Sequence, residues 1–233
     1  MLINHDVHIE KEIFEMYDRI EMGKHSVCKA CQEANVNLTK PVSFWFVGEK
    51  YYNSQYRVLF VGKNARGKVG SLVDDYYNST LIASSLWQKS WPYWSYTRAI
   101  SESLYGTEDG DYIAFTNIIK CNNSDTVDTT TQNMMTNCIE KLKIIKNEIK
   151  ILNPKSIVFI TSQHYDHMFQ HVFDDIVDSN KYIANIGAKK MDVWEFKGFI
   201  CDESINVLRI GHPERKKKYD FVNLVVNWIM SRD

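Results

Sequence analysis

Five cysteines have the clearest potential for chemistry in this chain: Cys28, Cys31, Cys121, Cys138 and Cys201. Two residues separate the first pair, and sixteen residues lie between Cys121 and Cys138. The count is odd, and the N-terminus opens acidic and polar without a signal-peptide pattern, which argues against a disulfide framework. Four thiolates from separate segments suit an iron–sulfur cluster or a structural zinc ion equally well. We expect no role for Cys201 in such a site.

Polar residues also follow short apolar runs at three places, where they could hold a flat ligand through hydrogen bonds. The turn Gly62–Gly67 follows one run, Asn117 ends a second, and His212-Pro213 follows a third. Taken separately, a tight turn, an asparagine that caps a turn and a His-Pro loop pair are ordinary features. Because the carboxyl ends of parallel strands meet at one edge of a sheet, the three together predict a binding crevice.

The elements that would position these residues alternate along the chain. Short apolar runs typical of buried parallel strands occupy residues 57–62, 112–117, 156–160 and 206–210. Apolar residues recur at helical spacing over residues 9–21, 135–152 and 221–229. Strands that alternate with helices predict a parallel sheet covered on both faces. We therefore expect an α/β fold, a three-layer α/β/α sandwich with a central, mainly parallel four-stranded sheet, in a single domain over residues 1–233.

The composition, with 44% hydrophobic and 24% charged residues, is that of an ordinary globular protein. No apolar run approaches the about 18–20 residues that a membrane helix needs, so we expect a cytoplasmic protein without membrane contact. The formal net charge of −1 gives no overall basic field, and nucleic-acid binding would require a local patch. The candidate is the run Arg215–Lys218, although four consecutive cations are more often a solvated helix start.

The motifs at the predicted strand ends resemble those of the uracil-DNA glycosylase superfamily over most of the chain. That superfamily has a Gly-x-Asp/Asn/Ala-Pro turn, an Asn at a later strand end and a final His-Pro. The matching positions here are Gly62–Gly67, Asn117 and His212-Pro213. The stretch Thr116–Cys121 is particularly similar to the Thr-Asn-x-x-Lys-Cys of the thermophile-type, iron–sulfur cluster-bearing class, family four.

This resemblance implies a cofactor, a [4Fe–4S] cluster held by Cys28, Cys31, Cys121 and Cys138, and it favours iron over zinc. It also implies a reaction, hydrolysis of the N-glycosidic bond of a flipped-out pyrimidine, which leaves an abasic site in DNA. Asn64 would position the attacking water. His212, neutral or protonated, would stabilise the departing base anion by donating a hydrogen bond to it.

Binding residues follow from the same resemblance. Asn117 would read the base edge, although its amide, if turned over, would match cytosine as well as uracil. A stacking ring would come from the aromatic run 91–96, which could equally be core or a surface loop. The expected substrate-binding residues are Gly62, Lys63, Arg66, Trp94, Tyr96 and Asn117. Arg215, Lys216 and Lys217 would contact phosphates beside the flipped nucleotide. We expect a monomer whose partner is DNA and which needs no protein partner.

The first motif departs from the cluster-bearing class, which typically has Gly-Glu-Ala-Pro-Gly. Lys63 replaces the Glu, Asn64 the Ala and Ala65 the Pro. Arg66 replaces a glycine, or the tyrosine that in the most uracil-selective class blocks substituents at C5. Uracil is the default substrate, and a hydroxymethylated or glucosylated cytosine of phage DNA is the alternative, which would make the protein an antiviral defence enzyme. A second alternative is a non-catalytic DNA-binding or redox-sensing iron–sulfur module.

Overall fold

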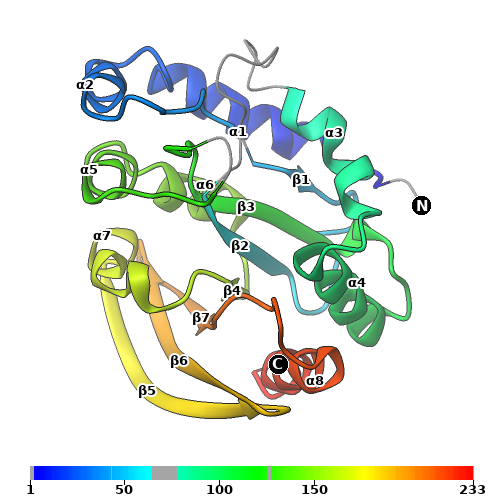
Figure 1. The fold of residues 1–233 in the computed structure, drawn as a ribbon. Coiled ribbons are helices and arrows are strands. Elements are labelled where there is room, and N and C mark those ends of the chain that lie inside the picture. The colour runs from blue at the N-terminus through cyan, green and yellow to red at the C-terminus, as the bar shows by residue number, and fades with distance from the viewer. Residues whose placement is uncertain (1–2, 43, 65–77, 125–126, 233) are drawn as a thin grey trace.

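The structure, a computed structural model, describes residues 3–42, 44–64, 78–124 and 127–232. Within them one mixed sheet has seven strands in the order β1-β3-β2-β4-β7-β6-β5 (Figure 1). The α/β class is therefore as predicted. The strands are β1 (Phe46–Val47), β2 (Val58–Asn64), β3 (Ile113–Ile119), β4 (Ser156–Phe159), β5 (Asp175–Ile186), β6 (Lys189–Ile200) and β7 (Glu203–Arg209).

The four predicted strands are the parallel part of this sheet. β2 pairs in parallel with both β3 and β4, and β4 pairs in parallel with β7. The residues of β2, β3 and β4 are nearly all buried because these strands pack against helices on both sides, which explains the continuous apolar runs.

The predicted four-stranded sheet is wrong in the number of strands. A two-residue strand, β1, pairs antiparallel with β3, and the long strands β5 and β6 extend the other side as an antiparallel hairpin. Only one of the twelve residues of β5 is buried. A strand that is exposed along most of its length has no apolar run and no clean alternation, so the pattern search missed it.

Helices cover both faces of the sheet (Figure 1). On one face the buried side chains of α1 and α6 pack with alternate residues of the parallel strands. On the other face α3, α4 and α8 pack with the remaining residues of these strands. The helices are α1 (Val7–Arg19), α2 (Ser26–Ala34), α3 (Asn78–Trp87), α4 (Pro92–Tyr105), α5 (Gln132–Met135), α6 (Ile144–Leu152), α7 (Phe169–Val172) and α8 (Lys218–Met230). Shorter helical turns are η1 (Gly110–Tyr112), the π-helical η2 (Thr136–Lys141) and η3 (Gln163–Met168).

The prediction of one continuous helix over residues 135–152 is wrong. The segment divides into α5, η2 and α6, and Lys143 adopts a left-handed conformation with φ of 52° immediately before α6. The apolar residues still fall on one buried side, because Cys138, Ile139, Ile145 and Ile149 all join the same core. The spacing therefore identified the buried face but not the interruption. Among the described residues, no helix is both long and apolar enough to span a membrane.

Candidate functional site

Gly62 is the residue around which polar side chains gather at the carboxyl ends of the strands. It lies opposite Asn117 in the parallel register of β2 and β3. A Cβ atom added to Gly62 would lie 1.8 Å from the hydroxyl oxygen of Tyr93 and 2.4 Å from Oδ1 of Asn117. Only glycine therefore allows these two side chains to approach the end of β2 so closely.

Four buried polar atoms at this edge have no hydrogen-bond partner among the described residues. They are Oδ1 of Asn64, the hydroxyl of Tyr93, Nδ2 of Asn117 and Oγ1 of Thr161. An unpaired buried donor or acceptor costs about 1–3 kcal/mol, and native proteins contain few of them. In an open α/β sheet, ligands bind at the carboxyl ends of the strands. Six other buried polar atoms of the described residues also lack a partner, so it is the clustering of these four at the carboxyl edge that points to a ligand site.

The amide of Asn64 is oriented by a neighbouring loop. Its Nδ2 donates to Oδ1 of Asn122, which also accepts a hydrogen bond of 2.8 Å from the backbone N–H of Thr129. Asn122 is buried, and its own Nδ2 donates to the carbonyl of Val127 at 2.9 Å. With the donor side of Asn64 engaged in this way, its Oδ1 is left as an acceptor at the strand end.

His212 lies in the loop after β7, and its ring stacks on Tyr93 with the centroids 5.7 Å apart and an angle of 3° between the planes. Its Nδ1 accepts a hydrogen bond of 3.2 Å from the backbone N–H of Glu214. Burial of the imidazole, followed by the charge of Lys63, lowers the pKa of His212 to about 4. The ring is therefore neutral near pH 7, and the hydrogen bond to Nδ1 leaves the proton on Nε2.

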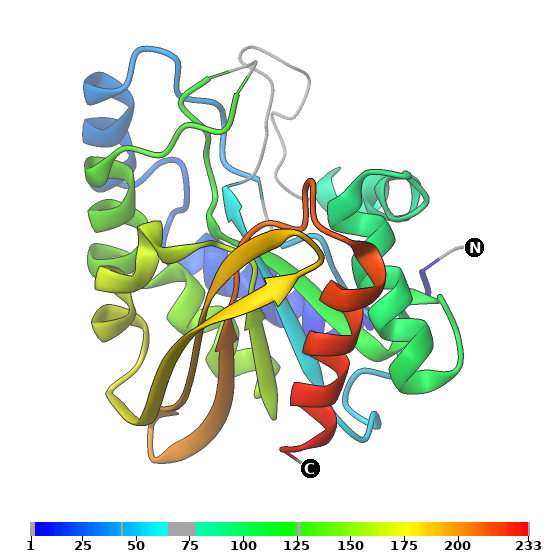
Figure 2. The ribbon, with the colours of Figure 1, turned by 60° about the horizontal axis from the view of Figure 1, so that its bottom comes forward.

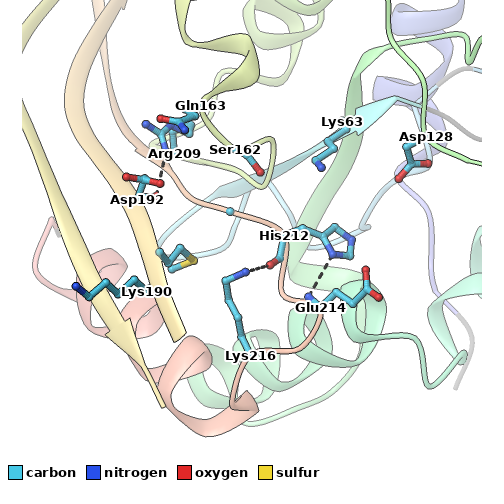
Figure 3. Close-up of a pocket in the computed structure, with 12 residues that line it drawn as sticks. Lys63, Asp128, Ser162, Gln163, Lys190, Asp192, Arg209, His212, Glu214 and Lys216 are labelled. Carbon is cyan, nitrogen blue, oxygen red and sulfur yellow. Dashed lines mark hydrogen bonds between the residues drawn. The ribbon is translucent and has the colours of Figure 1, made fainter. Parts of the chain in front are cut away.

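A polar pocket of about 360 Å³ adjoins His212 (Figure 3). Its volume lies in the range of small-molecule sites. Both cations and carboxylates line it: Lys63 and Asp128 lie on one side, and Glu214 and Lys216 lie next to the imidazole. Nζ of Lys216 donates to the carbonyl of His212, which links the two ends of this short loop.

The four cysteines that the sequence singled out lie in one neighbourhood. Burial raises the pKa of Cys121 well above its ordinary value, and the charges of Cys138, Cys28 and Cys31 raise it further. None of the four forms a disulfide. Among the described residues, however, no group of three or more His, Cys, Asp or Glu side chains is arranged as a closed set of ligands for a metal ion.

Hydrogen bonds to sulfur accompany this arrangement. The backbone N–H of Gly23 donates to Sγ of Cys28 at 3.3 Å, and Nδ2 of Asn35 donates to Sγ of Cys31 at 3.6 Å. Burial raises the pKa of Cys138 to about 12, although a hydrogen bond from the backbone of Lys120 opposes the shift. Such N–H donors stabilise thiolates and tune iron–sulfur clusters, so the donor set fits a four-cysteine cluster chemically.

The remaining predicted residues have different surroundings. Trp94 is buried in the core, where it packs against Trp45, Trp87 and Phe115. The hydroxyl of Tyr96 donates to the carbonyl of Lys216 at 2.7 Å, so this ring supports the loop that carries His212. Arg66 lies outside the described residues.

The predicted DNA contacts follow His212 in the chain. Arg215 and Lys217 are exposed, and Lys216 is partly buried. Arg215 has a left-handed backbone with φ of 62° at the tip of the loop.

The sequence reasoning missed Tyr93, Thr161 and Asn122. Tyr93 lies within the aromatic run 91–96, but nothing in the sequence distinguishes it from Trp94 and Tyr96. Thr161 directly follows the predicted third strand, so the same rule that selected Asn117 could have found it. Asn122 follows Cys121 in a loop, and nothing in the sequence distinguishes it from an ordinary loop residue.

No protein-family model, no curated protein and no solved structure matches this chain.

Proposed function

We propose that this protein is a DNA glycosylase that hydrolyses the N-glycosidic bond of a flipped-out pyrimidine, with uracil as the default base. The observation that carries the proposal is the set of buried, unpartnered polar atoms around Gly62, with a neutral His212 beside it. A base inside a duplex is inaccessible, so an enzyme that excises it must hold the flipped base through its hydrogen-bonding edge.

Asn117 is the proposed reader of that edge. Its unpartnered atom is Nδ2, which is a donor, and the complementary group on a pyrimidine is a carbonyl such as O4 of uracil. The hydroxyl of Tyr93 lies beside it over Gly62 and can donate or accept. A base that fills this space would pair groups that are otherwise buried without partners, which favours binding over an empty site.

His212 and Asn64 are the proposed catalytic residues. As the bond between C1′ and N1 breaks, its electron pair moves onto the base, and negative charge develops on the base oxygens. The Nε2–H of a neutral His212 would donate to O2 and stabilise this charge; loss of one such donor costs about 10²–10³-fold in rate. Oδ1 of Asn64 would accept a hydrogen bond from the water whose oxygen attacks C1′, and the water's second proton passes to solvent.

The proposed cofactor is a [4Fe–4S] cluster on Cys28, Cys31, Cys121 and Cys138, with zinc as the alternative. When bound, such a cluster would supply a cross-link between segments and no step of the hydrolysis. The cysteines belong to α2, to the loop just after β3 and to η2, so their ligation would fix the loop that begins at Cys121 and carries Asn122. The cations Arg215, Lys216 and Lys217 would contact phosphates on either side of the flipped nucleotide.

One observation favours a second substrate, a cytosine with a hydroxymethyl or sugar group at C5. The pocket beside His212 is larger than a bare pyrimidine ring requires, and both ammonium and carboxylate groups line it. Hydroxyl groups both donate and accept, so they are suited to such a mixed lining. Lys63, where the cluster-bearing class has Glu, is one of these lining residues. On this alternative the protein would act against phage DNA.

The test uses anaerobically purified protein and duplexes that contain uracil, 5-hydroxymethylcytosine or its glucosylated form. Abasic sites are scored as alkali-sensitive strand breaks. Release of uracil alone supports the first substrate, and release of the modified cytosines alone supports the second.

The His212→Ala variant should lose about 10²–10³-fold in rate. His8→Ala, which changes an exposed histidine of α1, should keep the full rate. Protein that binds DNA and releases no base from any of these duplexes would contradict a glycosylase and favour a non-catalytic module.

A further inference from the structure

The turn between β5 and β6 lies beside the segment that leads from His212 into α8 (Figure 2). The backbone N–H of Gly187 in this turn donates to Oδ2 of Asp220 in the first turn of α8, at 2.9 Å. The buried Met191 at the start of β6 faces Gly211, and its Cγ lies 3.4 Å from where a Cβ on that glycine would be. The hairpin end is therefore fixed to the loop of the proposed site by contacts on two sides.

This junction concentrates positive charge. Its cations are Lys63, Lys189, Lys190, Arg215, Lys216 and Lys217. Its carboxylates are Asp128, Asp192, Glu214 and Asp220. Arg209 also lines the pocket, but it pairs with Asp166 at 2.8 Å and adds no net charge. Six cations less four carboxylates therefore give a local charge of +2, on a chain whose formal net charge is −1. A local excess of this sign on a slightly acidic protein is the feature expected of a site for a polyanion.

Lys189 and Lys190 are, with Lys63 and Lys216 inside the pocket, cations of this junction that form no ion pair with a carboxylate of the described residues. Lys217 pairs with Asp220 at 3.6 Å, and Arg215 lies 3.8 Å from Glu214. No ion pair joins Lys189 or Lys190 to a carboxylate within the described part of the chain, and both are exposed. In Figure 3 the side chain of Lys190 extends away from His212 along the hairpin, toward the outer rim of the pocket.

We propose that the β5–β6 turn is a second contact for the DNA backbone, in which Lys189 and Lys190 bind phosphates outside those held by the loop that follows His212. This inference rests on the proposed function, since it assumes that DNA lies across the carboxyl edge of the sheet. The turn has the properties such a contact needs, because two consecutive exposed lysines, whose side chains lie on opposite faces of β6, follow a turn that is fixed by Asp220.

The expected effect of these two contacts on DNA affinity can be calculated from the salt dependence of binding. Each phosphate contact releases about 0.9 counterion from duplex DNA, so two contacts contribute about 1.8 to the slope of log affinity against log salt concentration. Between 50 and 200 mM salt, the wild-type protein should therefore lose about 12-fold more affinity than a variant without these two contacts.

The experiment measures the affinity of the full-length protein for an undamaged 30-base-pair duplex by fluorescence anisotropy over this salt range. The variant is Lys189→Gln/Lys190→Gln. The matched control is Lys11→Gln/Lys150→Gln, which removes the same two charges from α1 and α6 on the other face of the sheet. Circular dichroism verifies that each variant is folded. We expect the hairpin variant to bind more weakly at 50 mM salt with a slope lower by about 2, and the control to keep the wild-type slope.

Equal slopes for the wild type, the hairpin variant and the control would overturn the inference about the turn. If the wild-type protein in that case still releases base, the proposed function survives, and an acidic protein becomes the better partner for the turn. Absence of both DNA binding and base release in the wild type would overturn the turn proposal and the proposed function together.

Discussion

Replacement of Tyr93 by phenylalanine tests whether the polar atoms around Gly62 belong to a ligand site. The change removes only the hydroxyl, which is buried and has no partner among the described residues. An unpaired buried hydroxyl costs about 1–3 kcal/mol, so Tyr93→Phe should stabilise the free protein by about 1 kcal/mol or more. For a chain of this length, each kcal/mol raises the melting temperature by about 2–4 °C.

A matched control is Tyr165→Phe, which removes a hydroxyl that donates to Oγ1 of Thr130 at 2.9 Å. Because this bond is made within the protein, its loss should destabilise the fold by about 0.5–1.5 kcal/mol. Thermal and denaturant unfolding of the two variants should therefore shift in opposite directions. A melting temperature that falls for Tyr93→Phe as it does for Tyr165→Phe would refute the reasoning, because it would mean that the Tyr93 hydroxyl is satisfied inside the protein.

The Tyr93→Phe variant should also bind and process substrate less well than the wild-type protein. If the Tyr93 hydroxyl bonds the flipped base, its loss costs about 0.5–1.5 kcal/mol of binding in the transition state, which is about a 2- to 13-fold lower rate. Single-turnover excision measures this effect. If the hydroxyl is left without a partner for the sake of ligand binding, its removal should raise stability and lower activity. Removal of a purely structural hydroxyl would lower both.

Three further predictions follow from the site. The His212 imidazole should stay neutral above about pH 5 and titrate near 4 by nitrogen NMR. Since its folded pKa is below the unfolded value of 6.5, the stability that the neutral ring contributes should fall as the pH drops from about 6.5 to 4, by about 3 kcal/mol in all, measured by denaturant unfolding at each pH. Cys138→Ser should reduce bound iron and sulfide together, whereas Cys201→Ser at an exposed position should reduce neither, as measured by metal and sulfide analysis. Gly62→Ala should abolish base release and lower the melting temperature, because the new methyl overlaps Tyr93 and Asn117.

The parallel strands and their ends could be predicted because each strand is an apolar run that ends at polar residues. Gly62, Asn117 and the segment beginning at His212 were placed correctly at the carboxyl edge by this rule alone. The strand β5 could not be predicted, because a twelve-residue strand with mostly exposed side chains shows neither an apolar run nor a helical repeat.

Tyr93 was missed for a different reason, the unknown orientation of its helix. It is the second residue of a helix, α4, in which consecutive residues face different directions. Three aromatic residues within four positions therefore have three different environments. Tyr93 faces Gly62, Trp94 enters the core and Tyr96 supports the carbonyl of Lys216. Composition identifies such a run as aromatic, but the phase of the helix decides which ring reaches the site.

Two successive residues of β3 show how structural and ligand-directed polar groups differ. Thr116 faces α6, where its hydroxyl donates to Glu148 at 2.8 Å and accepts from Nζ of Lys120 at 2.6 Å. Nζ of Lys120 also lies 2.6 Å from Glu148, so this fully buried ion pair has its hydrogen bonds satisfied within the fold.

Asn117 points to the opposite face of the same strand, toward Gly62, and its Nδ2 has no partner among the described residues. Both residues are buried, so burial alone does not distinguish them. What distinguishes them is that one network is complete and the other is not. An incomplete network costs free energy in the unliganded protein, and such a cost is retained where a ligand offsets it. That contrast along one strand is the physical reason to assign Asn117, rather than the charged Lys120, to the base.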